Sequence, residues 1–191
     1  MPVDTFRVRA AALTTLIAPM WLVRFLDMVT PGNGSVAGHG IVPRTWYGLE
    51  GIPLAPFIHV SVEHLLANTA PLLILGALVV MRGVGELVFV VVTSGLIGGL
   101  GTWMFGAGDS QHVGASGVVF GLFGYLLFRT AFDRRWSSAV IALVVAVGYG
   151  TMMMSSLIPH ESISWSGHFF GFLGGLAAAR MRYARYVPRA A

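Results

Sequence analysis

The sequence predicts an all-α membrane protein: one bundle of six membrane-spanning helices, with both termini in the cytoplasm, formed by residues 1–191 as a single domain. The first observation behind this is composition, since 55% of the residues are hydrophobic, 10% are charged and the mean hydropathy is +0.76. A soluble domain carries about 25% charged residues, so this composition excludes a soluble globular protein and, equally, a disordered one. The absence of cysteine excludes a disulfide scaffold, a thiolate metal site and a cysteine nucleophile.

The second observation is a series of apolar segments, each close to the roughly 20 residues that a membrane-spanning helix needs. They cover residues 10–26, 57–80, 84–105, 116–128, 139–158 and 165–179. The fourth and sixth are short for a full crossing. Residues 29–56 are rich in glycine and proline and too polar to span, so we expect this first loop to lie at one membrane face.

The third observation is the position of the basic residues, which are all arginine. Ten of the twelve flank alternate ends of the apolar segments and so fall on one side: Arg7, Arg9, Arg82, Arg129, Arg134, Arg135, Arg180, Arg182, Arg185 and Arg189. Only Arg24 and Arg44 fall on the other side. The positive-inside rule therefore predicts cytoplasmic termini and an even number of spans. Topology explains the basic pI, so no nucleic-acid partner is expected; Arg134-Arg135 and the C-terminal arginines are expected to be cytoplasmic anchors to the anionic lipid bilayer.

An alternative interpretation of the N-terminus is a signal peptide. A basic head, an apolar run from Ala10 and the small-x-small triplet Ser35-Val36-Ala37 fit that pattern in part. The run lies far from the triplet, however, and cleavage would leave five spans against the charge pattern. The six-span interpretation is therefore favoured.

Polar side chains inside the predicted spans lie at one depth. Asn68 precedes Arg82 by 14 residues, Ser116 precedes Arg129 by 13 and His168 precedes Arg180 by 12. At 1.5 Å per residue, all three lie about 18–21 Å above the inner face of the hydrocarbon core. His64 stands one turn above Asn68 on the same helical face. Because polar groups within a membrane are costly, such a cluster suggests a functional site, reached through a water-filled pocket that opens outward.

This cluster suits serine hydrolysis. Ser116 begins a helix, where free backbone N–H groups stabilise negative charge, and His168 at matching depth is the expected base. The N–H of Ser116 and the side chains of His64 and Asn68 are candidate donors to an oxyanion. The sixth span carries no acid at that depth, which favours a Ser-His dyad over a triad. No cofactor or metal is expected.

Other interpretations stay open. Glycines at small-x-x-x-small spacing are commonly packing devices, and a single intramembrane histidine often only ties helices together. A catalytically silent protein that binds membrane clients, or a small transporter, would also place polar groups within the bilayer. Histidines of the outer loops, His39, His112 and His160, are expected to be ordinary solvated residues.

Three motifs resemble those of the rhomboid family of intramembrane serine proteases. They are His59-x4-His64-x3-Asn68 on the second span, Gly114-Ala115-Ser116-Gly117 on the fourth, and Gly167-His168-Phe169-Phe170-Gly171 with Gly175 on the sixth. The resemblance covers about residues 40–179, and residues 41–44 and 48–52 look like the compact six-span bacterial type. It implies cleavage of the transmembrane segments of other proteins in the bacterial plasma (inner) membrane.

The resemblance also implies roles for individual residues. Ser116 corresponds to the nucleophile, His168 to the general base, and His64 and Asn68 to the oxyanion side. Supporting roles fall to His59, Gly114, Gly117, Phe120 and Gly171, with His59 organising a loop and Phe120 packing on His168. Two features depart from the family pattern: Arg44-Thr45-Trp46 reverses the usual Trp-Arg order of the first loop, and Phe120 stands where many members have tyrosine.

Overall fold

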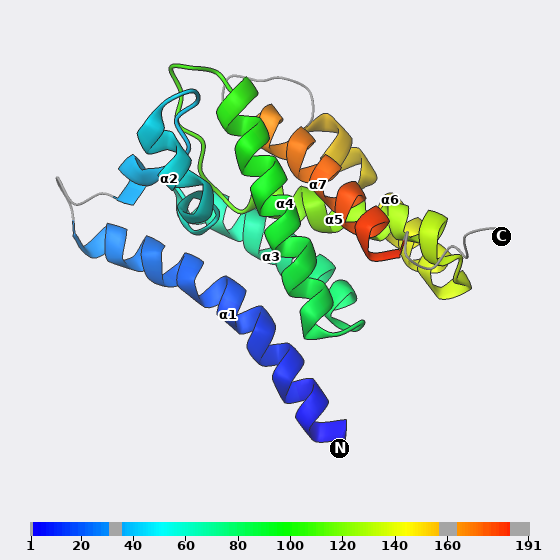
Figure 1. Cartoon of the computed structure of the whole chain (residues 1–191). Helices are drawn as coiled ribbons and strands as arrows, with labels where there is room; N and C mark the ends of the chain where they lie inside the picture. Colours follow the sequence, from blue (N-terminus) through cyan, green and yellow to red (C-terminus); the bar gives the residue numbers. More distant parts are fainter. Residues whose placement is uncertain (1, 31–35, 157–163, 184–191) are drawn as a thin grey trace.

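The computed structural model describes residues 2–30, 36–156 and 164–183, and these residues form helices and turns without a β-strand (Figure 1). The elements are α1 (Pro2–Val29), η1 (Val36–His39), α2 (Trp46–Leu54), η2 (Ala55–Phe57), α3 (Val62–Val80), α4 (Val84–Phe105), α5 (Ser116–Asp133), α6 (Trp136–Ser155) and α7 (Trp165–Tyr183). The predicted all-α class is therefore confirmed.

Within the described residues, four helices are long and apolar enough to cross a membrane, by length and composition: Thr5–Val29 within α1, then α3, α4 and α6. The other two predicted spans correspond to α5 and α7. α5 includes Arg129 and Asp133, and α7 carries Arg180 and Arg182 in its last turn and is rich in glycine and alanine, so their own hydropathy is lower. Both helices lie inside the bundle, where neighbouring helices shield them.

One predicted boundary is clearly wrong, because the helix of the second span begins at Val62 and not at Phe57. Residues 55–57 form the short turn η2, and Ile58 is extended, with φ −96° and ψ 130°. The helix then begins after Ser61, whose side chain accepts a hydrogen bond from the backbone N–H of His64 at 3.1 Å. Serine is a preferred N-cap residue, so this capping bond defines the start of α3.

The remaining helices agree with the predicted spans in position, and α1, α5 and α7 differ from them in length. α4 begins and ends where the third predicted span does, and α5 begins at Ser116, where the fourth predicted span begins. α1, α5 and α7 extend beyond the predicted segments, because their helical hydrogen bonding continues into more polar residues. The predicted end of the fifth span at Ile158 lies outside the described residues.

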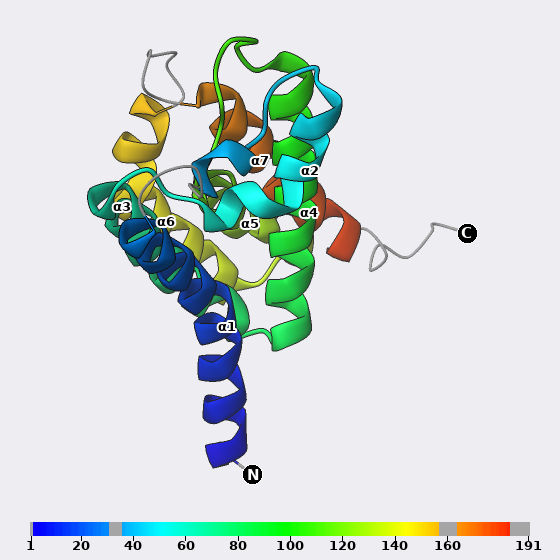
Figure 2. The ribbon, with the colours of Figure 1, turned by 90° about the vertical axis from the view of Figure 1, so that its left-hand side faces the viewer.

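Glycines allow α5, α7 and α4 to pack closely at the centre of the bundle (Figures 1 and 2). A Cβ atom on Gly171 of α7 would lie 2.1 Å from the carbonyl oxygen of Gly117 on α5. On the other side of α7, a Cβ atom on Gly98 of α4 would lie 3.2 Å from the Cα atom of Gly171. α7 is therefore held between α4 and α5, whereas α1 lies along the outside of the molecule.

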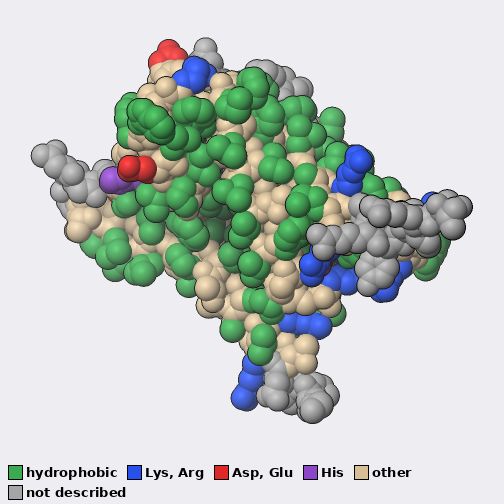
Figure 3. All heavy atoms as spheres, viewed as in Figure 1, with side chains coloured by type: hydrophobic (Ala, Val, Ile, Leu, Met, Phe, Trp, Pro, Cys, Tyr) green, Lys and Arg blue, Asp and Glu red, His purple; other side chains and the backbone are tan. Residues whose placement is uncertain are grey.

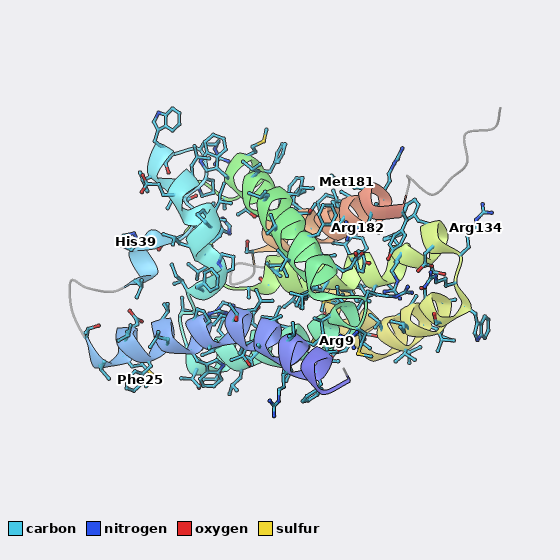
Figure 4. All side chains as sticks on the ribbon, turned by 60° about the horizontal axis from the view of Figure 1, so that its bottom comes forward. Arg9, Phe25, His39, Arg134, Met181 and Arg182 are labelled. Carbon is cyan, nitrogen blue, oxygen red and sulfur yellow. The ribbon has the colours of Figure 1, made fainter. Side chains whose placement is uncertain are left out.

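Arginines gather at one end of the bundle. Figure 3 shows most of the visible basic side chains near the N-terminal half of α1 and the last turn of α7, while the visible acidic and histidine side chains lie at the opposite end. In Figure 4, Arg9, Arg134 and Arg182 lie at one end, and Phe25 and His39 at the other. The two ends of the bundle thus differ in charge as the arginine pattern predicts.

Arg129 is predicted to follow the fourth span, but it lies within the helix α5. α5 continues past it, and its side chain is completely buried, 3.4 Å from the carboxylate of Asp133 and 3.2 Å from the hydroxyl of Ser138. A second buried group nearby is Glu86, which binds Arg182 at 2.7 Å and accepts a hydrogen bond from the hydroxyl of Tyr125. Buried charges need such partners, so this end of the bundle is held by ion pairs as well as by apolar packing.

Candidate active site

Ser116 is the first residue of α5, and the residues before it are tightly held. Gly114 has φ +109°, a conformation that favours glycine. Its N–H donates to the carbonyl of Ala55 at 2.8 Å, and the N–H of Ala115 donates to Nε2 of His59 at 3.4 Å. His59 is buried beside this turn. The expected loop-organising role of His59 therefore has a geometric basis in the contact with Ala115.

His64 and Asn68 lie against the same turn from α3. A Cβ atom on Gly114 would lie 2.9 Å from Nε2 of His64 and 3.8 Å from Nδ2 of Asn68. Asn68 is buried and uses one N–H to donate to the backbone carbonyl of His64 at 2.9 Å. The amide has a second N–H. Both side chains thus stand beside the turn that leads into Ser116, and Gly114 leaves room for them.

His168 lies in the first turn of α7 and is 8% exposed. Its ring stacks on Phe120, with centroids 4.2 Å apart and planes 5° apart. Its Nδ1 lies 2.9 Å from the carbonyl oxygen of Ser156. A carbonyl can only accept, so Nδ1 carries the proton in this bond and the lone pair of the neutral ring is on Nε2.

One cavity of about 850 Å³ collects these groups. Its lining includes Ser116, His168, Phe120, His64 and Asn68, which come from α5, α7 and α3. Residues predicted from three separate spans therefore meet at one place. Among the described residues, no hydrogen bond joins the hydroxyl of Ser116 to His168, so the two groups share the cavity without being bonded.

The first loop is anchored by residues that the family pattern did not indicate. Arg44, with φ +60°, donates from its guanidinium to the carbonyls of Met104 at 3.2 Å and Gly106 at 2.9 Å. The indole of Trp103 donates to the carbonyl of Thr45 at 2.8 Å. An arginine from the loop and a tryptophan from α4 thus tie the first loop to the end of α4, even though the usual Trp-Arg order is reversed.

His112 was predicted to be a solvated loop residue, and this is wrong. It is half-buried between two serine hydroxyls, with Nε2 3.0 Å from Ser110 and Nδ1 2.7 Å from Ser164. Burial lowers the pKa of His112 below its usual value. Nothing in the local sequence pairs positions 112 and 164, so only its place four residues before Ser116 could have drawn attention to it.

The other two loop histidines differ. His39 is exposed, as predicted, and His160 lies outside the described residues. Within the described part of the chain, no three histidine or acidic side chains are grouped as metal ligands would be.

Comparison with known proteins identifies the family of the chain. Residues 45–185 match the model of the Rhomboid domain. The chain is 35% identical over 196 residues to an uncharacterized protein of Mycobacterium tuberculosis, across 96% of this chain and 81% of that protein. It is 31% identical to YdcA of Bacillus subtilis, across 91% and 85% of the two chains, and 28% identical to the rhomboid protease GluP of the same organism, across 73% of this chain and 26% of GluP. The chain therefore belongs to the rhomboid family.

Proposed function

We propose that this protein is an intramembrane serine endopeptidase that hydrolyses a peptide bond in or near the transmembrane segment of other membrane proteins. The observation that carries the proposal is the meeting of Ser116, His168, His64 and Asn68 in one cavity. Membership of a family of serine proteases supports the same reaction. No cofactor is required, because a hydroxyl and an imidazole together suffice for nucleophilic hydrolysis.

In the proposed reaction, Nε2 of His168 takes the proton of the Ser116 hydroxyl as Oγ attacks the substrate carbonyl. The hydrogen bond from Nδ1 to the carbonyl of Ser156 favours the tautomer with a free Nε2. That carbonyl takes the orienting role that a carboxylate has in a triad. His168 then returns the proton to the leaving amine, and water hydrolyses the acyl-enzyme by the same steps.

The oxyanion of the tetrahedral intermediate would be stabilised from the side of Gly114. The first N–H groups of a helix have no intrahelical acceptor, so the N–H of Ser116 is available there. Nε2 of His64 and the second N–H of Asn68 are the other proposed donors. Donors fixed in advance around a developing charge are a large source of rate enhancement.

The proposed topology has six crossings, with both termini in the cytoplasm of the plasma membrane and residues 1–191 as one membrane domain. α5 and α7 would be the remaining two crossings beside the four more apolar helices. Their lower hydropathy is compatible with crossing, because they pack inside the bundle and neighbouring helices shield them from lipid. The gathering of arginines at one end supports the orientation. Substrate helices would enter from the bilayer and unwind so that a carbonyl reaches Ser116.

Labelling by a fluorophosphonate probe, together with cleavage of transmembrane reporter proteins in liposomes, tests the proposal. The wild type and Ser137→Ala, which removes an exposed serine at the start of α6, should label and cleave. Ser116→Ala should do neither, and His168→Ala should lose cleavage.

A second candidate function is that of a catalytically silent rhomboid that binds membrane clients. The observation that favours it is the absence of a hydrogen bond between Ser116 and His168 among the described residues. A folded wild type that neither labels nor cleaves any reporter would overturn the protease proposal in favour of this binder.

A further inference from the structure

We propose that His112 is a positioning residue that couples the segment carrying the nucleophile to the helix carrying the general base. This inference rests on the proposed function, because it assumes those roles for Ser116 and His168. It concerns a residue outside the three family motifs, which touches neither Ser116 nor His168 through a hydrogen bond in the described structure.

The hydrogen bonds around His112 define the protonation of its ring. The hydroxyl of Ser110 donates to the carbonyl of Ala107 at 2.9 Å, so towards His112 its oxygen must accept. Nε2 of His112 therefore carries the proton and donates to Ser110 at 3.0 Å. In the neutral ring Nδ1 is then an acceptor, and the hydroxyl of Ser164 donates to it at 2.7 Å.

The bond to Ser164 reaches the first turn of α7. Ser164 directly precedes α7, and its carbonyl accepts the backbone N–H of His168 at 3.1 Å. The same residue thus holds His112 with its side chain and the backbone of His168 with its carbonyl. A shift of Ser164 would move the first turn of α7, and with it the imidazole of His168, which lines the same cavity as Ser116.

The other side of His112 is fixed independently of its side chain. Its backbone N–H and carbonyl pair with Ile41 of the first loop, at 2.9 Å in each direction. Its ring lies against Gly106 at the end of α4, where a Cβ atom would be 2.8 Å from Nε2. The backbone of His112 is therefore held by the first loop, and its imidazole is left to bind Ser164 at the start of α7.

Burial also suits His112 to this role. The neutral ring offers one donor and one acceptor, and the two serines need one of each. The lowered pKa of His112, caused by burial, favours that neutral form. His112 lines the same cavity as Ser116 and His168, so a displacement at His112 is transmitted over a short distance.

The expected consequence of losing this bond is misalignment of the base rather than loss of substrate binding. A displacement of about 1 Å in a catalytic site can cost about a hundredfold in rate. We expect His112→Ala to lower kcat by about 10- to 100-fold while KM changes less than about threefold. His112→Gln, whose amide keeps one donor and one acceptor, should recover part of kcat, which a purely space-filling role would not explain.

A double-mutant cycle with Ser164→Ala tests the coupling, with His39→Ala as the control for loss of an exposed histidine at the same end of the molecule. If one bond carries the effect, the double variant His112→Ala/Ser164→Ala should be little slower than His112→Ala alone. Additive losses, an unchanged kcat in His112→Ala, or a loss that His112→Gln and His112→Ala share equally would overturn the proposal.

Hydrogen–deuterium exchange gives a readout that does not need activity. His112→Ala should increase exchange in residues 164–172 as well as in 106–118, and Ser164→Ala should increase exchange in 106–118. Faster exchange confined to the substituted segment would overturn the coupling. If the wild type proves inactive while exchange in the two segments still changes together, the protease proposal fails and the coupling stands.

Discussion

The ring of Phe120 lies parallel to the imidazole of His168, with 4.2 Å between the centroids and 5° between the planes. Phe120 is one turn after Ser116 on α5, and His168 is on α7, so the stack joins the two helices at the proposed dyad. With Nδ1 held by Ser156, the stack leaves the imidazole little freedom to rotate. Many rhomboids have tyrosine here, but the stack needs only an aromatic ring.

We therefore expect Phe120→Leu to lower kcat about two- to tenfold, since an aromatic pair contributes about 0.5–1.5 kcal/mol beyond its buried area. Phe120→Tyr keeps the ring and should cleave at close to the wild-type rate. Reporter cleavage and thermal unfolding should be measured on both variants. A Phe120→Leu enzyme that matches the wild type, or a Phe120→Tyr enzyme that is as slow as Phe120→Leu, would contradict this role of the ring.

The contact between α5 and α7 predicts a large effect at Gly171. Gly171→Ala would place a methyl group 2.1 Å from the backbone carbonyl of Gly117, and neither backbone can move without opening the site. We expect a loss of stability of about 1–3 kcal/mol or more, together with loss of cleavage. Thermal unfolding in detergent, combined with reporter cleavage, measures both effects.

Gly148 on α6 is the matched control, because a Cβ atom there meets no atom within 4 Å. Gly148→Ala should leave cleavage unchanged and stabilise the helix by up to about 1 kcal/mol through the better helix propensity of alanine. Equal destabilisation by the two substitutions would show that the packing of α7 on α5 is not the cause.

The burial of His59 should make the stability of the protein depend on pH. Burial, with a smaller contribution from the charge of His64, lowers the pKa of His59 from 6.5 to about 4. Between these values the unfolded chain binds a proton that the folded chain does not, so the free energy of unfolding falls as the pH is lowered from 6.5 to 4. The contribution of His59 reaches about 3 kcal/mol at the acid end.

Thermal unfolding between pH 7.5 and 4 measures this effect. His59→Gln should be less stable than the wild type at pH 7.5, since it loses the imidazole that accepts from Ala115, and its stability should fall less steeply towards pH 4. His39→Gln, which changes an exposed histidine, should keep the wild-type slope. An unchanged slope in His59→Gln would contradict the assignment.

The meeting of Asn68, Ser116 and His168 could be expected from the sequence, because helices have a constant rise and the spacing to the next arginine places the three residues at one level. Asn68, Ser116 and His168 lie at similar distances from such arginines, and they line the same cavity in the structure. Their depth in the membrane stays a prediction, and Arg129, which is buried within α5, does not mark the end of that helix. The predicted start of α3 is wrong because Phe57 and Ile58 are apolar and extend the hydrophobic segment, although neither residue belongs to the helix.

The residues that the sequence did not reveal act through partners far along the chain. His112 bonds to Ser164, Arg44 binds the end of α4, and Trp103 bonds back to the first loop. No local pattern marks such pairs, because each residue type taken alone is common in loops.

The sequence by itself determined that this is an all-helical membrane protein of the rhomboid type, and it located the motifs that contain Ser116 and His168 on separate segments. Those properties follow from composition, periodicity and short contiguous motifs. Only the tertiary structure decided that Phe120 stacks on His168, that Gly171 touches the backbone of Gly117, and that His112 links two segments of the site. These contacts depend on how close the helices approach and on which way each ring turns, and packing in three dimensions sets both.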